Sequence, residues 1–426
     1  MTNWEHNDDL IWHPYSSLMP VFPNLPVASA KGAHIHLKDG RVIIDGVSSW
    51  WVNLHGHSHP VLAEALYKQA LALEHVIFAG FTHQPATDLA EQLIDYTACS
   101  FTKLFYSDNG STAVEVALKM ALQYWINTGN PRHKIIALEG AFHGDTFGAM
   151  SVSSRSVFNQ TFESLMWEVD FIPFPSAEQE EDCLKKFESL LTERPAALIV
   201  EPLLQGTAGM RVYRPEFLDR LFALAKKEGV ICIADEVLTG FGRTGKPFAS
   251  HYLQEKPDIM CLSKGITGGT MPFGVTLANK KIVSAFEVPD LDKVLYHGHS
   301  YTANPLACAV ALASLTLLKE SSSRIQELSG MQATFAQRLK ERFHLKRVDH
   351  IGTIISLELV IEPGYLSSIR NELYAFFLAH DVLLRPLGNI LYILPPYCIE
   401  TKDLERIYDL IFELLETKGF SIKPIV

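Results

Sequence analysis

Six short apolar runs constrain the fold of this chain more than any other feature of its sequence. The runs are KLFYS (103–107), KIIAL (134–138), AALIVEP (196–202), VICIAD (230–235), DIMCLS (258–263) and FGVTLAN (273–279). Near-continuous apolar runs of this length are typical of strands buried on both faces, as in a mostly parallel sheet covered by helices. The stretch between the first two runs, STAVEVALKMALQYW (111–125), has apolar residues at helical spacing. We therefore expect an α/β fold with a doubly wound sheet.

The two ends of the chain have a different pattern. From about residue 320, long amphipathic helices such as MQATFAQRLKERF alternate with a few strand-like runs (TIISLELV, NILYILPP). The first fifty residues read as extended segments with Pro and Gly turns. We expect a large domain over residues 49–319 and a smaller α+β domain assembled from residues 1–48 and 320–426.

Charge and composition exclude several classes of protein. The 426 residues include 37 Lys and Arg against 48 Asp and Glu, a net charge of −11, which argues against a nucleic-acid or anionic-membrane partner. The six cysteines lie far apart without a CxxC pair, which favours reduced thiols over a disulfide framework or a zinc site. No apolar run reaches membrane-spanning length, and MTNWEHNDDL does not resemble a signal peptide. We expect a cytoplasmic protein.

Three motifs occur in the order expected of a pyridoxal phosphate (PLP) enzyme. The first is SDNGST (107–112), between a predicted strand and a predicted helix. Gly110 would allow close approach of backbone amides, and Ser111 and Thr112 offer hydroxyl and N–H groups at a helix N-terminus, which suits a phosphate. A plain helix N-cap made by Asn109 or Ser111 is an equal alternative.

The other two motifs follow neighbouring strands. In IADEVLTGFGRTG (233–245), Asp235 ends an apolar run, where a carboxylate could pair with a protonated pyridine nitrogen. In DIMCLSKGITGG (258–269), Lys264 follows a buried run, and desolvation would favour the neutral amine that a Schiff base requires. The alternatives are a solvated strand-end acid and a solvated loop lysine. The βα spacing between Asp235 and Lys264 favours the functional interpretation.

With these motifs, nearly the whole chain resembles the class III (ω-amino) aminotransferases of PLP fold type I. The resemblance implies that Lys264 forms the internal aldimine with PLP, that Asp235 is the partner of the pyridine nitrogen, and that Gly110 and Ser111 bind the phosphate. It also implies that Phe142 in AFHG (141–144) stacks on the cofactor ring. HGHSYTANPLACA (297–309) resembles the segment that reaches across a homodimer to the partner's phosphate, with Ser300 at the hydroxyl position.

Within this class, IWHPYSS, SSWWVNLHGHSHP, FHGDTFGAMSVS and LLRPLGNILYILPPY resemble the branch that acts in biotin synthesis. The implied reaction transfers an amino group, usually from S-adenosylmethionine, to 8-amino-7-oxononanoate. The resemblance implies that Trp50 and Trp51 form a wall of the substrate pocket and that Arg385 binds the far carboxylate, with a surface arginine as the alternative. The further substrate positions that it implies are Tyr15, Asp145, Gly298 and Tyr392.

Two questions stay open at this point. Phe142 stands where enzymes that use S-adenosylmethionine carry a tyrosine, and some relatives use lysine as donor, so the donor is not decided. A class III enzyme acting on acetylornithine or 4-aminobutyrate is the alternative function. A nicotinamide dehydrogenase would need a GxGxxG motif, which SDNGST does not supply. The chain does not have this motif after its first strand-like run.

The alternating histidines His55, His57 and His59 are a separate candidate site. Histidines at this spacing can bind a metal. HGHSHP also reads as a turn that leads into the helix VLAEALYKQALAL, with Pro60 near its first turn. We favour the architectural interpretation and expect no metal.

Overall fold

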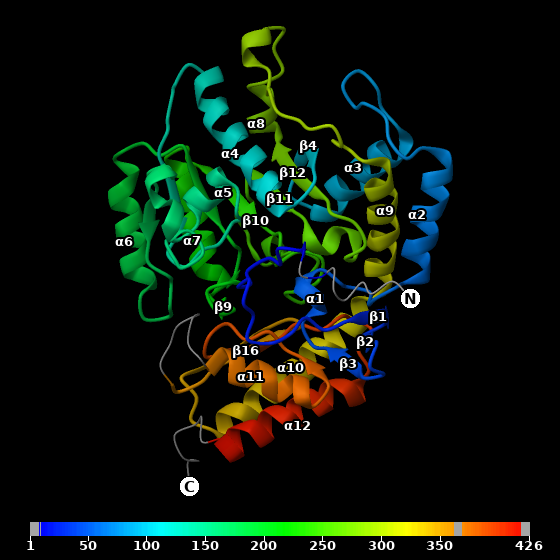
Figure 1. Cartoon of the computed structure of the whole chain (residues 1–426). Helices are drawn as coiled ribbons and strands as arrows, with labels where there is room; N and C mark the ends of the chain where they lie inside the picture. Colours follow the sequence, from blue (N-terminus) through cyan, green and yellow to red (C-terminus); the bar gives the residue numbers. More distant parts are fainter. Residues whose placement is uncertain (1–7, 9, 362–368, 419–426) are drawn as a thin grey trace.

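The computed structural model describes residues 8, 10–361 and 369–418. Its centre is a seven-stranded sheet with the order β4-β12-β11-β10-β7-β5-β6 (Figure 1). These strands are β4 (Phe101–Ser107), β5 (Ile135–Leu138), β6 (Asp170–Ile172), β7 (Ala197–Val200), β10 (Ile231–Asp235), β11 (Ile259–Leu262) and β12 (Gly274–Asn279). β12 runs opposite to the other six strands, which share one direction. The predicted mostly parallel sheet is confirmed, and each of the six apolar runs overlaps one of its strands.

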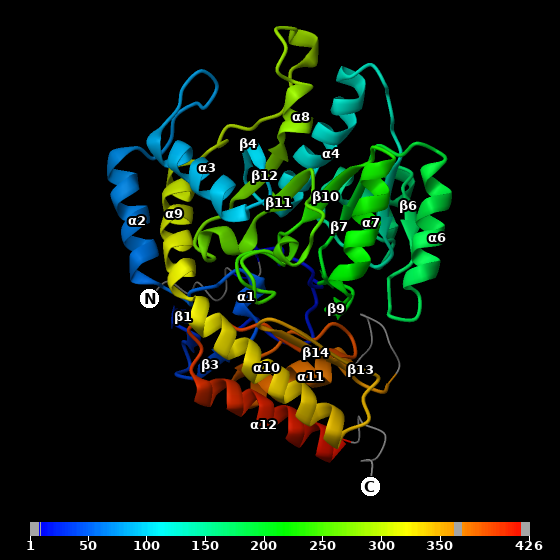
Figure 2. The ribbon, with the colours of Figure 1, turned by 180° about the vertical axis from the view of Figure 1, so that it is seen from behind.

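Helices cover both faces of this sheet, because neighbouring residues of each strand point to opposite sides. Ile231 and Ile233 pack on the side of α4 (Gly110–Asn127), whereas Cys232 packs on the side of α6 (Glu180–Leu191) and α7 (Pro215–Lys227). The helices α2 (Pro60–Ala72) and α3 (Gln84–Thr97) pack against α9 (Pro305–Glu320) beside the β4 edge (Figures 1 and 2).

Strands from both chain ends meet below the large sheet (Figure 2). One sheet has the order β1-β2-β3-β15 and joins β1 (Val27–Lys31), β2 (His34–Leu37) and β3 (Val42–Asp45) to β15 (Val382–Leu383). A second sheet contains β13 (Arg347–Ile351), β14 (Ile354–Glu358) and β16 (Ile390–Ile393). The helices α10 (Ser322–Arg342), α11 (Ile369–Ala379) and α12 (Thr401–Lys418) lie beside these two sheets. The domain limits at 48/49 and 319/320 stay a prediction.

The remaining α-helices and strands are short. They are α1 (Ser48–Trp51), α5 (Phe147–Val152), α8 (Lys280–Ser284), β8 (Leu204–Gln205) and β9 (Arg211–Val212). Most of MTNWEHNDDL, over which we expect no signal peptide, lies outside the described residues. Within the described part of the chain, no single helix is long and apolar enough to cross a membrane. The pair α9 and α10 passes that test only together, with a bend of 64° between them.

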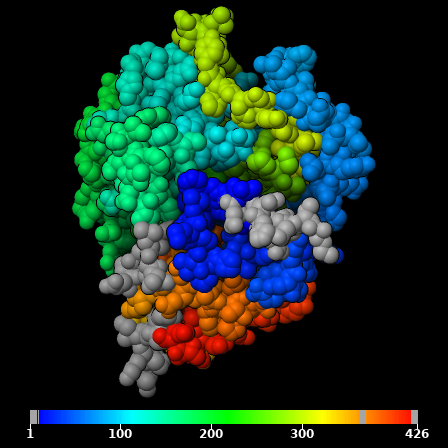
Figure 3. Space-filling model, in the orientation of Figure 1, coloured from blue at the N-terminus to red at the C-terminus, as the bar shows by residue number. Residues whose placement is uncertain are grey.

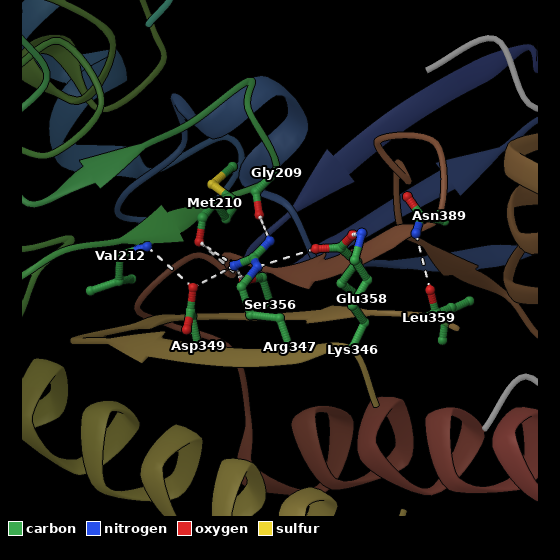
Figure 4. Close-up of polar contacts among 10 residues, drawn as sticks. All are labelled: Gly209, Met210, Val212, Lys346, Arg347, Asp349, Ser356, Glu358, Leu359 and Asn389. Atoms are coloured by element: carbon green, nitrogen blue, oxygen red, sulfur yellow. Dashed lines mark hydrogen bonds and ion pairs between the residues drawn. The ribbon is translucent and has the colours of Figure 1, made fainter. Parts of the chain in front are cut away.

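A polar interface fixes the β8–β9 hairpin to the β13–β14–β16 sheet (Figure 4). Arg347 donates a hydrogen bond to the carbonyl of Gly209 at 2.7 Å, and the Ser356 hydroxyl donates to the carbonyl of Met210 at 3.1 Å. The backbone N–H of Val212 donates to Asp349 at 3.2 Å. The interface therefore holds the loop between β8 and β9 in place against the β13–β14–β16 sheet.

Candidate active site

A cavity of about 450 Å³ lies at the carboxyl ends of β10 and β11. Ligands of open α/β sheets usually bind at this edge, because loops and helix N-termini converge there. The lining includes Gly110, Ser111, Phe142, Asp145, Asp235 and Lys264, all predicted site residues. The sheet therefore brings together residues that are up to 154 positions apart in the sequence, as 264 minus 110 shows.

The N-terminus of α4 supplies one wall of this cavity. Asn109 is its N-cap, and its side chain accepts a hydrogen bond from the N–H of Thr112 at 2.9 Å. This confirms the N-cap for Asn109, while the N–H groups of Gly110 and Ser111 make no hydrogen bond to the described residues. A Cβ atom on Gly110 would lie 2.9 Å from a methyl group of Val237, so the packing favours glycine. Two N–H donors at a helix N-terminus are thus free to bind an anion.

Asp235 lies at the base of the cavity with only 4% of its surface exposed. One carboxylate oxygen lies 2.6 Å from Nδ1 of His143, and the other accepts the N–H of Val237 at 3.1 Å. A solvated strand-end acid, the alternative raised by the sequence, is therefore wrong. Two fixed donors orient the carboxylate at the cavity.

Lys264 begins a short 3₁₀ turn directly after β11, with a positive φ of 43°. Its amine lies 4.8 Å from the centre of the Trp51 ring. Burial lowers the pKa of Lys264, and the carboxylates of Asp235 and Glu201 oppose this shift. The side chain borders the cavity and is no solvated loop lysine, so a larger fraction of its amine is neutral than for an ordinary lysine.

A second cavity of about 350 Å³ adjoins the first and shares Phe142 and Lys264 with it. Its other lining residues include Tyr15, Trp50, Trp51, Phe158, Thr207, Arg385 and Tyr392. The Arg385 guanidinium lies 4.3 Å from the centre of the Trp50 ring, and the Trp51 indole N–H donates to the Tyr392 hydroxyl at 3.0 Å. Five predicted substrate residues thus meet in one mainly aromatic pocket.

The N-terminal segment closes one side of this pocket. Figure 3 shows this segment, in dark blue, lying across the face of the molecule between its upper and lower parts. The Tyr15 hydroxyl donates to Asp145, and the Tyr15 ring lies 5.5 Å from Trp50 and 5.8 Å from Phe158. Tyr15 therefore connects the two cavities.

Trp50 and Trp51 lie in a backbone turn that the sequence did not indicate. Ser48, Ser49 and Trp51 have φ values of 52°, 59° and 69°, in the left-handed region that L-residues avoid. Such residues are typically disfavoured by about 1–3 kcal/mol each and persist only where the surroundings hold them. The turn directs one indole towards Arg385 and the other towards Lys264.

Two predicted site residues lie elsewhere. Gly298 and Ser300 are exposed and line neither cavity. His55 contacts Ser314 at 3.0 Å and His57 contacts Asp45 at 2.9 Å, while His59 precedes Pro60 at the start of α2 and its ring centre lies 6.1 Å from that of His55. Among the described residues, no group of three or more His, Cys, Asp or Glu side chains is arranged to hold a metal ion.

Glu201 is a site residue that the sequence analysis missed. It is buried in the wall of the first cavity and accepts the N–H groups of Phe142 at 3.1 Å and Gly206 at 2.9 Å. Burial raises the pKa of Glu201 to about 7. Its position directly after the run AALIV, like that of Asp235 after VICIA, was a signal that could have identified it.

The first cavity has the groups that PLP requires. The free N–H groups of Gly110 and Ser111 suit a phosphate. The oriented carboxylate of Asp235 suits a protonated ring nitrogen, and the buried amine of Lys264, whose pKa is lowered, suits a carbonyl. Phe142 and Val237 provide apolar surface on the same cavity. The residues present therefore fit this cofactor.

Comparisons with known proteins agree with this geometry. The family model described as aminotransferase class-III matches residues 18–415. A relative from Synechococcus elongatus, named adenosylmethionine-8-amino-7-oxononanoate aminotransferase, is 47% identical, covering 95% of this chain and 98% of its own. The solved structure of an enzyme of the same name from Methanocaldococcus jannaschii is 34% identical, with a TM-score of 0.91 and coverage of 97% and 98%.

A third relative carries the cofactor. The PLP-bound structure of an amine transaminase from an uncultivated Pseudomonas species is 30% identical, with a TM-score of 0.89, covering 94% of this chain and 97% of its own. The matched family model spans far more than half of the chain. This chain therefore belongs to the class III aminotransferases, a family of PLP-dependent enzymes.

Proposed function

We propose that this protein transfers an amino group from S-adenosylmethionine to 8-amino-7-oxononanoate, giving 7,8-diaminononanoate in biotin synthesis. The names of the relatives from S. elongatus and M. jannaschii support this proposal. The observation that carries it is the second cavity, in which Trp50 and Trp51 form an apolar wall that ends at Arg385.

PLP would be held by residues of the first cavity. The N–H groups of Gly110 and Ser111 would bind its phosphate, Phe142 would stack on its ring, and the Lys264 amine would bond to its carbonyl carbon. When bound, PLP supplies an electron sink for the bonds at the amine-bearing carbon of the substrate. Asp235, oriented by His143 and Val237, would hold a proton on the ring nitrogen.

Lys264 would also carry the proton transfers. Its amine borders both cavities, so a substrate bound in the second cavity lies within its reach. A lowered pKa makes this amine a more available general base than that of an ordinary lysine. The aromatic walls and Tyr15 would exclude water while the proton moves.

The second cavity suits a long acceptor with a terminal carboxylate. Aromatic rings bind a hydrocarbon chain with little conformational cost. Within the described part of the chain, Arg385 forms no ion pair, so its guanidinium is available for a carboxylate. Guanidinium and carboxylate can form two parallel hydrogen bonds.

The donor half-reaction tests this function directly. Because donor and acceptor react in turn, the donor can be mixed alone with the PLP form, and loss of its visible absorbance band followed. We expect bleaching by S-adenosylmethionine, with Phe142 tolerated in place of tyrosine. Bleaching by lysine would keep the proposed product and change the donor. Bleaching by glutamate alone, with no use of the oxononanoate, would favour an enzyme for acetylornithine or 4-aminobutyrate.

We also propose that the protein is a homodimer with each active site at the interface. The exposed Gly298 and Ser300 line neither cavity of their own chain, as expected of residues that serve the partner's site. Large exposed apolar side chains lie near them in the chain, including Tyr296 at 70% exposure and Tyr301 at 62%. Patches of this kind mark protein interfaces. An active monomer in analytical ultracentrifugation would refute the dimer.

Replacing Arg385 by alanine should weaken acceptor binding and spare the donor. A hydrogen bond to a charged group contributes about 1.5–3 kcal/mol, so the KM for the oxononanoate should rise roughly 10- to 100-fold. The R385K variant keeps the charge and should recover only part of the affinity, because an ammonium group cannot form two parallel hydrogen bonds to a carboxylate. R406A on α12, which removes a surface guanidinium, is the control. Equal losses in the two half-reactions would contradict the assignment.

A further inference from the structure

His57 contacts a buried carboxylate next to the substrate pocket, and neither group is used by the mechanism above. Asp45 is the last residue of β3 and is fully buried. One of its oxygens accepts the backbone N–H of Val47 at 3.1 Å. The other accepts the N–H of Ser49 at 2.7 Å and lies 2.9 Å from Nε2 of His57. A single carboxylate thus accepts the backbone N–H groups of Val47 and Ser49, at the start of the turn that carries Trp50 and Trp51.

Both ring nitrogens of His57 have polar neighbours. With a hydrogen on Nε2, the imidazole donates to Asp45, and the side-chain amide of Asn53 lies 3.0 Å from Nδ1 and 3.3 Å from Nε2. That same amide donates to the Ser49 hydroxyl at 3.3 Å. The backbone of His57 is anchored in turn, because it exchanges two hydrogen bonds with Gly32 at 3.1 and 2.8 Å.

This network surrounds the part of the turn that has unfavourable backbone angles. Ser48, Ser49 and Trp51 have positive φ values. Residues in such a conformation need surrounding contacts that hold them there. The N–H of Ser49 donates to Asp45 and its hydroxyl accepts from Asn53, and both are contacts of this kind. The two indoles that follow line the substrate pocket beside Arg385 and Lys264.

We propose that the Asp45–His57 pair is a positioning device that sets the place of Trp50 and Trp51 and thereby the affinity for the acceptor. This inference rests on the proposed function, since it assigns the pocket wall to the acceptor chain. His57 and Asp45 touch neither cavity and act through the turn. His57, one of the three alternating histidines, thus has a part in shaping the pocket.

The test compares H57F, which keeps a ring and loses both hydrogen bonds, with H57Q, which keeps one donor and one acceptor. H59F is the matched control, because His59 lies two residues away and lines neither cavity. The acceptor binds to the enzyme form that the donor half-reaction leaves, in which the cofactor carries the amino group. We expect H57F to raise the dissociation constant of the oxononanoate for this form about 10-fold, with H57Q closer to the wild type. The rate of the donor half-reaction at saturation should stay within about threefold.

A second readout does not depend on activity. The chain has six tryptophans, and 5-fluorotryptophan labelling gives each a fluorine resonance, with those of Trp50 and Trp51 assigned by single Phe variants. In holoenzyme, H57F should shift or broaden these two resonances and leave the other four in place, whereas H59F should move neither. Unmoved resonances in H57F, or equal losses in both half-reactions, would overturn the proposal. If the wild type does not aminate the oxononanoate, the proposed function fails, and the resonances still decide whether the pair positions the turn.

Discussion

Lys264→Ala should abolish transamination while the protein still binds PLP. The amine of Lys264 is placed between the two cavities, where it would bond to the cofactor and move the proton of the substrate. General acid–base catalysis alone contributes about 10²- to 10⁴-fold. Loss of covalent attachment adds to this deficit. We expect a decrease in kcat of at least about 10⁴-fold, measured by single-turnover absorbance with excess donor.

Two controls distinguish a chemical defect from a folding defect. K246A removes an exposed lysine outside both cavities and should keep full activity. Added methylamine should restore part of the K264A rate, because a small amine can enter the space that the side chain leaves. The cofactor content, released by alkali and measured by absorbance, should match the wild type. A K264A rate within tenfold of the wild type would remove Lys264 from the mechanism.

The location of the first cavity could be predicted from the sequence, because it follows from the order of strands. β10 and β11 are parallel neighbours, and Asp235 pairs with Cys261. Lys264 lies three residues beyond Cys261 and therefore reaches the same edge of the sheet. Gly110 reaches that edge from α4. Buried strands with a polar residue at the carboxyl end are a local pattern, so a single sequence contains enough information to find them.

The second cavity depends on contacts between distant segments and on backbone angles, which local patterns do not contain. Trp51 donates to Tyr392, 341 residues away, and Tyr15 donates to Asp145, 130 residues away. Only the resemblance to a family placed these residues in one pocket. The positive φ values at Ser48 and Ser49 could not be predicted either, since serine usually avoids them. The part played by Asp45 in holding that turn became visible only with the contacts.

The edge strand β6 was missed for a physical reason as well. It has three residues, Asp170–Ile172, and pairs on one side only, with β5. A strand with so few apolar residues gives no periodic signal. Glu201 directly follows a buried strand, much as Asp235 ends one. It accepts the N–H of Phe142, a residue that lines both cavities.

Asp235→Asn should decrease kcat by about 100- to 1,000-fold, the range seen when one preorganised electrostatic partner is removed from a reacting centre. Asparagine keeps the shape of the side chain and can still accept the N–H of Val237. It lacks the negative charge that would hold a proton on the ring nitrogen and that faces Nδ1 of His143 at 2.6 Å. The defect should therefore appear in both half-reactions, unlike that of an acceptor-binding variant.

Asp258→Asn is the matched control for this variant. Asp258 is also a buried aspartate, 4% exposed, and it accepts the N–H of Cys232 at 2.9 Å and the amide of Asn279 at 2.8 Å. It precedes β11, at the opposite end from Lys264, and does not line either cavity. D258N should lower the melting temperature and leave kcat within about threefold, because its carboxylate stabilises the fold and is remote from the chemistry. If D235N instead shared this behaviour, with lower stability and nearly normal kcat in both half-reactions, Asp235 would be structural, and the ring nitrogen would need another partner.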